Sequence, residues 1–372
     1  MIDDPYIWKR EALFNAQENT REKWILQKTG MTYEFSVDVR FGKDIDIASI
    51  KSNSPFQEEM DFIKKRLLYL RETGEFVSTD KCPVCSEERE FAKGKVIICG
   101  VNYLQCTNCS HVFAATFPTT STLERYYKEN ALKNTYYMDP DEIKLRLKEI
   151  HLPKIEWIVD VYRRTFDREP KSILDIGAGV GHFLYGCKQK GLDVAGIEYS
   201  RDYIQWCQDH FEIELCADKN EVGQRRFDIV CSFNVIEHTH APDDFVKDYR
   251  LFMHERSLAV IETPKVNSFN SFLQSIYPDE PRTLLVPYDH NHLFTDSSLA
   301  VLLFENGLAP KSVWYFGQDM AELIMRICDE QNADSSELMT KLNLHLQQAI
   351  DLSHGSNIML FAATPITEIG EK

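Results

Sequence analysis

A glycine-rich turn is the stretch of this sequence whose residue types best suit ligand binding. Residues 172–183 read SILDIGAGVGHF, with glycines at Gly177, Gly179 and Gly181 between an apolar run and a helical pattern. Glycine is required where the backbone takes a positive φ or approaches a ligand closely, and the start of a helix offers N–H groups to that ligand. We therefore predict a strand, a turn that cradles a nucleotide-like ligand, and a helix.

Two carboxylates accompany this turn at fixed spacings. Asp175 stands two places before the first glycine, and Glu198 ends the next apolar segment, seventeen residues after Gly181. Dinucleotide sites have the pattern Gly-x-Gly-x-x-Gly, but His182 occupies the third glycine position here. The pattern Asp-x-Gly-x-Gly-x-Gly instead resembles the first motif of class I S-adenosylmethionine (SAM) methyltransferases. The resemblance implies SAM as the cofactor, with the turn around its methionine end and Glu198 accepting hydrogen bonds from both ribose hydroxyls.

Three further residues are expected at the cofactor site, and the resemblance gives a role to one of them, Asp218. Tyr199 follows Glu198 directly. Asp218 comes just after a predicted third strand, 213–216, where it would accept from the adenine amine, and Asn234 follows a predicted fourth strand, 227–233. Ligands of open α/β sheets bind beyond the carboxyl ends of the strands, so we expect these residues to converge on one crevice.

Histidines after the later strands are the candidates for acid–base chemistry. An acceptor must lose a proton as it attacks the methyl group of SAM, and imidazole has a suitable pKa near neutral pH. The resemblance matches Asp289 and His290 to an acidic residue and a histidine on the acceptor side. We rank His290 first as the base, ahead of His238 and His292, with Asp289 orienting it. A minority alternative is that Glu237 and His238 help to hold a divalent ion, as a similar pair does in ubiquinone-pathway O-methyltransferases.

Four of the ten cysteines form two Cys-x-x-Cys pairs, Cys82 with Cys85 and Cys106 with Cys109, separated by twenty residues. Two such pairs at this distance are typical of a zinc ribbon, in which each turn aims two thiolates at one tetrahedral Zn²⁺. Four protein ligands leave no open position, so the predicted zinc is structural. A redox role needs only one pair and is the weaker interpretation.

The order of motifs extends the resemblance. A zinc ribbon, a Pro-x-x-Ser segment and four tyrosines precede the glycine turn, namely Tyr126, Tyr127, Tyr136 and Tyr137. This order is similar to that of the zinc-ribbon methyltransferases of bacterial sugar and surface-polysaccharide biosynthesis, including the deoxysugar C-methyltransferases. The resemblance covers roughly residues 80–310. The resemblance implies a SAM-dependent methyltransferase whose small-molecule substrate is a nucleotide-linked sugar or a glycan precursor.

The charge balance argues against nucleic acid as a substrate. The 372 residues include 58 acidic and 42 basic side chains, for a formal net charge of −16, whereas binding to phosphates needs Lys and Arg in excess. No apolar run is as long as a membrane span, and the first ten residues lack the features of a signal peptide. We expect a cytoplasmic enzyme that acts on a small molecule.

Alternating strands and helices after Ser172 predict a doubly wound, Rossmann-like α/β sheet. The predicted organisation is an N-terminal helical segment over 1–80, the zinc ribbon over 81–118, a helical connector over 119–170 and the methyltransferase domain over 171–366. Within the first segment an amphipathic helix begins near Ser54 and ends before Gly74. Its apolar face would pack on the catalytic domain or on a second copy of the chain in a homodimer.

Two other function classes remain open. The domain could bind SAM or a nucleotide without catalysis, with the ribbon docking a protein partner. Glu198 and the histidine-rich stretch after the fifth strand argue against this alternative. A nicotinamide-dependent oxidoreductase is the third choice, which His182 at the third glycine position disfavours.

Overall fold

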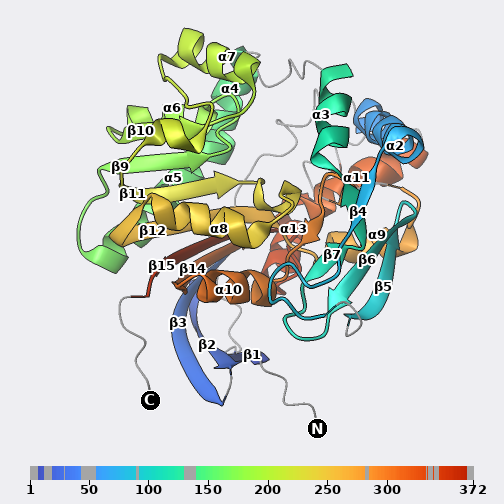
Figure 1. The fold of residues 1–372 in the computed structure, drawn as a ribbon, viewed down its shortest axis with the longest axis horizontal. Helices are drawn as coiled ribbons and strands as arrows, with labels where there is room; N and C mark the ends of the chain where they lie inside the picture. Colours follow the sequence, from blue (N-terminus) through green and yellow to red (C-terminus); the bar gives the residue numbers. More distant parts are fainter. Residues whose placement is uncertain are drawn as a thin grey trace.

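The computed structural model describes residues 7–11, 19–28, 30–42, 56–88, 92–129, 140–280, 285–331, 333, 338 and 343–366. Within these residues a nine-stranded sheet has the order β1-β2-β3-β14-β15-β12-β11-β9-β10 (Figure 1). In chain order its strands are β1 (Ile7–Glu11), β2 (Asn19–Lys28), β3 (Met31–Phe41), β9 (Ser172–Ile176), β10 (Asp193–Ile197), β11 (Phe227–Phe233), β12 (Met253–Pro264), β14 (Leu308–Phe316) and β15 (Ile358–Pro365). The Rossmann-like α/β prediction is confirmed.

The strands β9 to β12 pair in parallel, as the alternation of strands and helices predicts. β9 lies between β10 and β11, with Leu174 opposite both Ala195 and Val230, and β12 extends the sheet beside β11. β15 then pairs antiparallel with β12 and with β14. Because parallel strands share one direction, the carboxyl ends of β9 to β12 meet at the same edge of the sheet.

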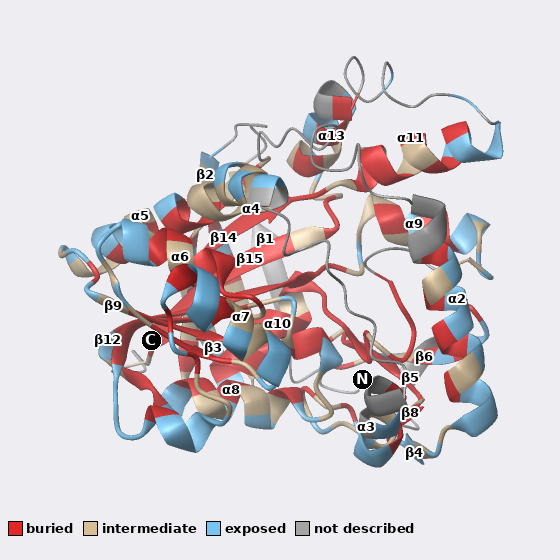
Figure 2. Ribbon diagram, turned by 90° about the horizontal axis from the view of Figure 1, so that it is seen from above, coloured by how far each residue is buried: buried red, intermediate tan, exposed pale blue. Residues whose placement is uncertain are grey.

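Helices cover both faces of this sheet (Figure 1). On one face lie α5 (Leu152–Phe166), α6 (His182–Gln189) and α7 (Arg201–Phe211), and on the other α8 (Pro242–Leu251) and α10 (Asp296–Glu305). Ile229 shares a cluster with Ile158 of α5, whereas its neighbour Val230 shares a different cluster with Tyr249 of α8, because successive strand residues point to opposite faces. Figure 2 shows the sheet as the buried layer and the outer helix surfaces as exposed.

The N-terminal part departs from the helical prediction for 1–80. β2 and β3 form a long antiparallel pair, and β3 pairs in parallel with β14 at the edge of the main sheet. Trp24, Leu26, Val37 and Val39 are buried at the two-residue spacing of strands. The prediction is therefore wrong for these strands, because abundant charged residues on the exposed face obscured that alternation.

Helix α2 (Phe56–Thr73) confirms the amphipathic helix in the part that the structure describes. Met60, Ile63, Leu67 and Leu70 are buried. They pack against the ribbon and the loop that follows β12. The predicted start at Ser54 lies outside the described residues. The contact of α2 with the loop after β12, which belongs to the predicted methyltransferase domain, matches the first of the two packing partners expected for it, whereas its contact with the ribbon was not predicted.

The predicted ribbon is a four-stranded sheet whose members come from two distant parts of the chain. Its strands are β5 (Ala92–Ile98), β6 (Val101–Cys106), β7 (Val112–Ala114) and β13 (His292–Leu293), and a separate pair joins β4 (Phe76–Ser78) to β8 (Thr116–Pro118). β13 belongs to the loop after β12 and pairs with β7. The ribbon is thus joined by strand pairing to the region predicted as the acceptor side.

The remaining elements connect or extend these units. The connector consists of α3 (Thr120–Glu129), α4 (Pro140–Arg146), a π-helical turn (Leu147–His151) and then α5. The predicted strand 213–216 is reduced to a single bridge between Cys216 and Ile197. Beyond β12 the chain forms α9 (Phe269–Ile276), and between β14 and β15 it forms α11 (Asp319–Glu330) and α13 (Asn343–Leu352). In the described part of the chain no helix is both long and apolar enough to cross a bilayer.

Candidate active site

The glycine turn joins β9 to α6 through three left-handed residues. Gly177, Gly179 and Gly181 have φ angles of 81°, 56° and 83°. A Cβ on Gly177 would lie 2.6 Å from Val235, and one on Gly181 would lie 2.3 Å from Cys207, but one on Gly179 would meet nothing within 4 Å. Packing therefore fixes the outer two glycines, whereas Gly179 borders open space, as a ligand cradle requires.

Glu198 faces this turn from the end of β10. Its Oε2 accepts a hydrogen bond from the backbone N–H of Gly179 at 2.8 Å, and its Oε1 accepts one from Ser200 at 2.8 Å. These bonds fix the carboxylate beside the open side of the turn. Each oxygen has two lone pairs and so retains capacity for a further donor, which is compatible with the predicted ribose contact.

Asp175 lies beneath the turn. Its side chain is only 2% exposed, and the Cys231 thiol donates to its Oδ1 at 3.8 Å. Burial raises the pKa of Asp175 to about 7, although the Cys231 contact acts in the opposite direction. A side chain with so little exposed surface has almost no area for contact with a ligand, so we expect Asp175 to support the turn from below.

The other predicted cofactor residues lie at the surface. Tyr199 is 76% exposed directly after Glu198, so its ring is accessible for stacking. Asp218 begins a 3₁₀ helix (Lys219–Val222) and accepts from the Asn220 N–H at 2.7 Å. Asn234 takes a left-handed φ of 54° at the end of β11. All three residues come just after segments that end at the same edge of the main sheet. The sequence predicts that the ligand binds at this edge.

Asn234 also meets a buried ion pair that sequence reasoning missed. Its Nδ2 donates to Glu262 Oε1 at 3.0 Å, and Lys154 of α5 pairs with the Glu262 carboxylate at 2.7 Å. The Lys154 ammonium lies 5.3 Å from the centroid of the Phe233 ring. Buried charges must be paired, so this network fixes the end of β11 relative to α5. Lys154 and Glu262 are 108 positions apart, and no local pattern reveals such a pair.

Two of the candidate histidines meet beyond β11. His238 ends a 3₁₀ turn (Ile236–His238), and its ring centroid lies 4.8 Å from that of His290. The side chain of His238 is 41% exposed, whereas His290 is only 6% exposed. His238 Nδ1 lies 2.9 Å from the backbone oxygen of Asp289. Since a carbonyl only accepts, Nδ1 carries the hydrogen, and Nε2 is the basic nitrogen of the neutral ring.

His292, the third candidate base, lies inside the ribbon interface. Its Nδ1 is 3.2 Å from His111 Nε2, and both imidazoles are buried. Burial lowers the pKa of His292 to about 3, and it lowers the pKa of His111 well below the usual value. An imidazole buried in this way is poorly placed to take a proton from a substrate, so the geometry favours His238 and His290 over His292.

Asp289 connects the site with the N-terminal helix. The segment 285–293, which we call the acceptor loop, contains Asp289, and the carboxylate of Asp289 forms an ion pair with Arg66 of α2. The Arg66 side chain is 9% exposed, and its guanidinium carbon lies 5.0 Å from the centroid of the Tyr126 ring. Sequence reasoning assigned no chemistry to α2 and missed Arg66, because helical periodicity does not show that a cation on a helix meets a carboxylate 223 positions away.

Glu237 lies behind the two histidines. It is fully buried, Thr263 Oγ1 donates to its Oε2 at 3.1 Å, and burial raises the pKa of Glu237 to about 7. Ligand atoms of Glu237, His238 and His290 lie within 4.8 Å of one another. One carboxylate and two imidazoles could hold a divalent ion, and this grouping adds His290 to the donors that the sequence suggested.

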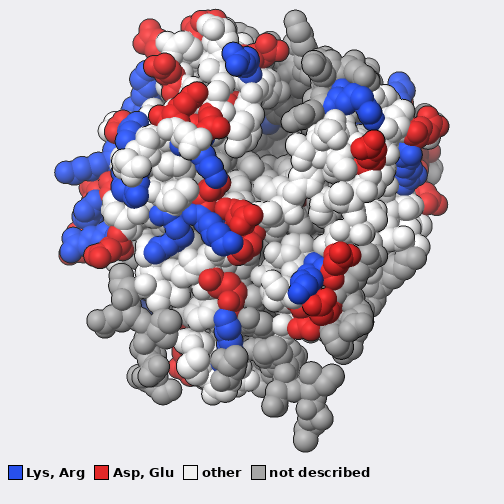
Figure 3. Space-filling model, viewed as in Figure 1, with Lys and Arg blue, Asp and Glu red and all other residues white. Residues whose placement is uncertain are grey.

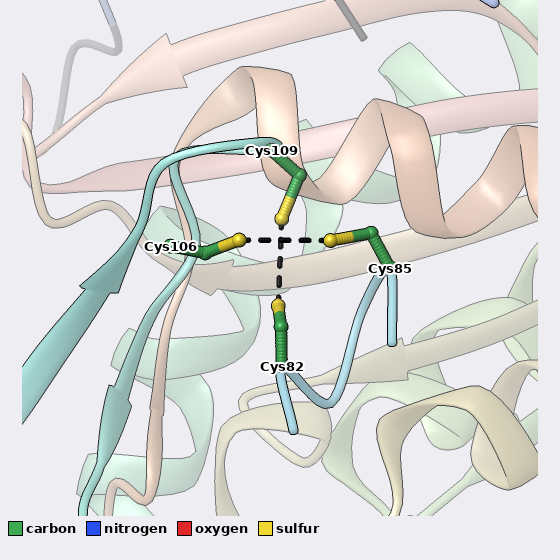
Figure 4. Close-up of side chains that lie close together, drawn as sticks. All are labelled: Cys82, Cys85, Cys106 and Cys109. Atoms are coloured by element: carbon green, nitrogen blue, oxygen red, sulfur yellow. Dashed lines mark hydrogen bonds between the residues drawn. The ribbon is translucent and has the colours of Figure 1, made fainter. Parts of the chain in front are cut away.

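The four cysteines converge as predicted (Figure 4). Cys82 Sγ lies 3.6 Å from Cys109 Sγ, and Cys85 Sγ lies 3.6 Å from Cys106 Sγ. Zn–S bonds of about 2.3 Å in a tetrahedron place the sulfurs roughly 3.8 Å apart. The four side chains therefore have the spacing that one zinc ion requires.

The chemistry of the cluster also fits a cation. Four cysteine sulfurs are the soft ligands that Zn²⁺ accepts in structural sites, and metal binding deprotonates them. Ser86 and Ser110 follow the pairs with left-handed φ angles of 61° and 63°, which bend each turn around the site. With four protein ligands and no open position, a bound zinc would be structural.

The ribbon holds the acceptor loop directly. The Tyr103 hydroxyl donates to the backbone oxygen of His290 at 2.8 Å, and the Ala114 N–H donates to that of Asn291 at 2.9 Å. The Asn291 N–H in turn donates to the backbone oxygen of Glu237 at 2.9 Å. These bonds link the ribbon, the acceptor loop and the turn that carries His238 into one wall of the site.

The surface in Figure 3 is hollowed between the side that carries α6 and α7 and the side that carries α2. Charged groups of both signs are interspersed on this face. It presents no continuous basic surface among the residues drawn in colour, in agreement with the acidic composition.

Comparison with known proteins bears on the central part of the chain. Residues 154–313 match the family model described as a methyltransferase domain. A ubiquinone biosynthesis O-methyltransferase of Bradyrhizobium diazoefficiens is 27% identical over 190 residues, which cover 46% of this chain and 75% of that protein. One from Rhodopseudomonas palustris is 29% identical over 224 residues, which cover 52% of this chain and 87% of that protein. The glycine turn, Glu198, His238 and the acceptor loop all lie within the region matched by the family model.

Two solved structures show weaker similarity. A plantazolicin methyltransferase in complex with S-adenosylhomocysteine (SAH) is 16% identical, with 67% of this chain and 100% of that chain covered and a TM-score of 0.42. A magnesium protoporphyrin IX methyltransferase of Synechocystis with bound SAH is 11% identical, with coverage of 66% and 100% and a TM-score of 0.44. Scores this low add no argument about substrate or mechanism.

Proposed function

The chain is a SAM-dependent methyltransferase, and we propose that it methylates a nucleotide-linked sugar or glycan precursor with His238 as the general base. The observation that carries the choice of base is the contact of His238 Nδ1 with the Asp289 carbonyl, which leaves the basic Nε2 on an exposed side chain. The sugar class is supported by the four-cysteine ribbon ahead of the domain and by the order of motifs that resembles sugar methyltransferases.

The chemistry divides between the cofactor and the protein. SAM supplies a methyl group that its sulfonium makes electrophilic. Gly179 and Glu198 would orient the cofactor, and Tyr199 would cover its adenosine part. His238 Nε2 would take the proton that the acceptor oxygen or carbon loses when the methyl group passes to it and the methyl–sulfur bond breaks to leave SAH. The Asp289 backbone oxygen, which lies 2.9 Å from His238 Nδ1, would then accept the Nδ1–H bond of the imidazolium until the proton passes to water.

His290 has a supporting place in this proposal. Its ring meets His238 at 68°, in an edge-to-face arrangement, and its backbone is anchored by Tyr103. We infer that it limits the rotation of the His238 ring.

A second candidate acceptor is a precursor of ubiquinone. It is favoured by the similarity to ubiquinone biosynthesis O-methyltransferases and by the Glu237, His238 and His290 cluster, which could hold a divalent ion. In that case turnover would depend on an added divalent cation, which the sugar proposal does not require.

The first test is calorimetric titration of the zinc-replete protein with SAH, with NAD as the control, followed by mass spectrometry of two acceptor panels. SAH binding together with methylation of a nucleotide sugar would support the proposal. Methylation of a ubiquinone precursor alone would favour the second acceptor. SAH binding without any product would favour the non-catalytic alternative, in which the ribbon docks a protein partner.

A further inference from the structure

Asp289 offers His238 two different acceptors. Its backbone oxygen lies 2.9 Å from His238 Nδ1, and its carboxylate Oδ1 lies 4.0 Å from the same nitrogen. A carboxylate is the stronger acceptor, because its charge strengthens the hydrogen bond. In this structure, however, the backbone oxygen receives the contact, and the carboxylate is engaged by Arg66.

The packing of α2 and the ring of Tyr126 hold the Arg66 side chain in position to bind the Asp289 carboxylate. The helix that carries it packs through its apolar face into the same cluster as Tyr103 and Leu293. Its guanidinium lies over the ring of buried Tyr126, a favourable position for a planar cation. With its side chain 9% exposed, the pair with Asp289 is weakly screened by solvent. Arg66 is therefore held in place by contacts other than its ion pair with Asp289.

We propose that Arg66 is a positioning residue, which binds the Asp289 carboxylate and thereby directs the Nδ1–H of His238 to the Asp289 backbone oxygen. The direction of this bond sets the plane of the imidazole and the direction in which Nε2 points. Without Arg66, the Asp289 carboxylate would turn toward His238 and rotate the ring. The functional part of this inference rests on the proposed role of His238 as the base.

The other groups close to His238 do not replace this contact. Glu237 Oε1 lies 4.0 Å from His238 Nε2, on the opposite edge of the ring, and the His290 ring lies edge to face with it. Both are anchored by bonds of their own, Glu237 to Thr263 and the His290 backbone to Tyr103.

The test compares Arg66→Met with the zinc-replete wild type by crystallography and by ¹⁵N spectra of histidine-labelled protein, in which His238→Gln identifies the resonances. In Arg66→Met we expect the Asp289 carboxylate within hydrogen-bond distance of His238 Nδ1, with a clear shift of both His238 nitrogen resonances. Arg66→Lys should shift them less, because it keeps the cation. In Arg66→Met/Asp289→Asn the resonances should return toward their wild-type positions, because no carboxylate is left to compete. SAH affinity should stay within about twofold throughout.

Arg125→Met is the matched control. Arg125 lies on α3 beside Tyr126 and donates to the backbone oxygen of Thr73 on α2, so its loss disturbs the same helix pair without touching Asp289. Its His238 resonances should match the wild type. Unchanged His238 resonances in Arg66→Met, or an equal shift in Arg125→Met, would overturn the proposal.

A second variant covers the case in which Arg66→Met does not fold. Asp289→Asn alone keeps the backbone acceptor and should leave the His238 resonances close to wild type, whereas a large shift there would also overturn the proposal. None of these readouts uses an acceptor. A failed acceptor screen would therefore reject the proposed function without changing this result, and an unchanged spectrum would reject the positioning role alone.

Discussion

The two sides of the crevice are built in different ways. The proposed cofactor side comes from one stretch of chain, residues 175–234, in which Gly179, Glu198 and Asn234 come after strands of the parallel sheet and Asp218 after the single bridge at Cys216. The acceptor side is assembled from α2, the ribbon, the end of β11 and the acceptor loop, through contacts such as Arg66 with Asp289 and Tyr103 with His290 that span 223 and 187 positions. The difference implies that changes in the distant N-terminal parts should disturb the acceptor side while SAM binding is retained.

The largest effect is expected on the cofactor side, from Gly179→Arg. Gly179 has a positive φ, and the space beside it is open, so a large side chain would strain the turn and fill the cofactor cradle. SAH binding should be abolished, as measured by calorimetry, while the circular dichroism spectrum and zinc content stay at wild-type values. Retained SAH affinity would remove the glycine turn from the cofactor site.

The second effect concerns the base on the acceptor side. His238→Ala should lower turnover by about 10² or more, the scale of a general base, without weakening SAH binding. His290→Ala should lower turnover less, because in our proposal His290 only supports His238. The reverse ranking of the two variants would return the role of base to His290, the residue that the sequence placed first.

The third effect tests the link between the ribbon and the acceptor loop. Cys106→Ser removes one of the four predicted zinc ligands and should release the metal and lower the thermal midpoint by about 5–10 °C, for a loss of a few kcal/mol. Turnover should fall because Tyr103 and Ala114 no longer hold the acceptor loop, while SAH affinity should change less than about threefold. A variant that keeps a full equivalent of zinc would exclude Cys106 as a ligand. An equal loss of SAH affinity and turnover would contradict the separation of the two sides.

The smallest effect concerns Asp175 under the glycine turn. Its pKa in the folded protein, about 7, lies above the ordinary value for aspartate. Between about pH 4 and 7 the folded protein therefore binds more protons than the unfolded chain, so this group makes stability fall as pH rises through that window. In Asp175→Asn the free energy of unfolding should decrease less steeply with rising pH, by up to about 1.4 kcal/mol per pH unit, as measured by urea unfolding at pH 5 and pH 8. The exposed Asp209→Asn should leave the slope of the unfolding free energy against pH unchanged. A slope in Asp175→Asn that equals the wild-type slope would refute the effect of burial on Asp175.

The sequence predicted some elements of the fold well and others poorly. The predicted strand 227–233 and the predicted amphipathic helix agree with β11 and α2 of the structure. Both predictions rest on periodicity and flanking residues, which are local to each element. The strands β2 and β3 were missed, because charged residues on their exposed face obscure the alternation and because β3 pairs with β14, about 270 residues later in the chain. The segment 213–216 is too irregular to form more than one bridge, although its apolar residues suggested a strand.

The sequence by itself determined the motifs whose residues lie close together along the chain. The glycine turn and the cysteine pairs belong to this group, since a strand–turn–helix unit or a tight turn fixes the relative positions of residues a few places apart. Only the tertiary structure decided that His238 is exposed while His290 and His292 are buried, and that Arg66 meets Asp289. Burial and ion pairing depend on which distant segments pack together, and the spacing of residues along the chain does not specify that packing.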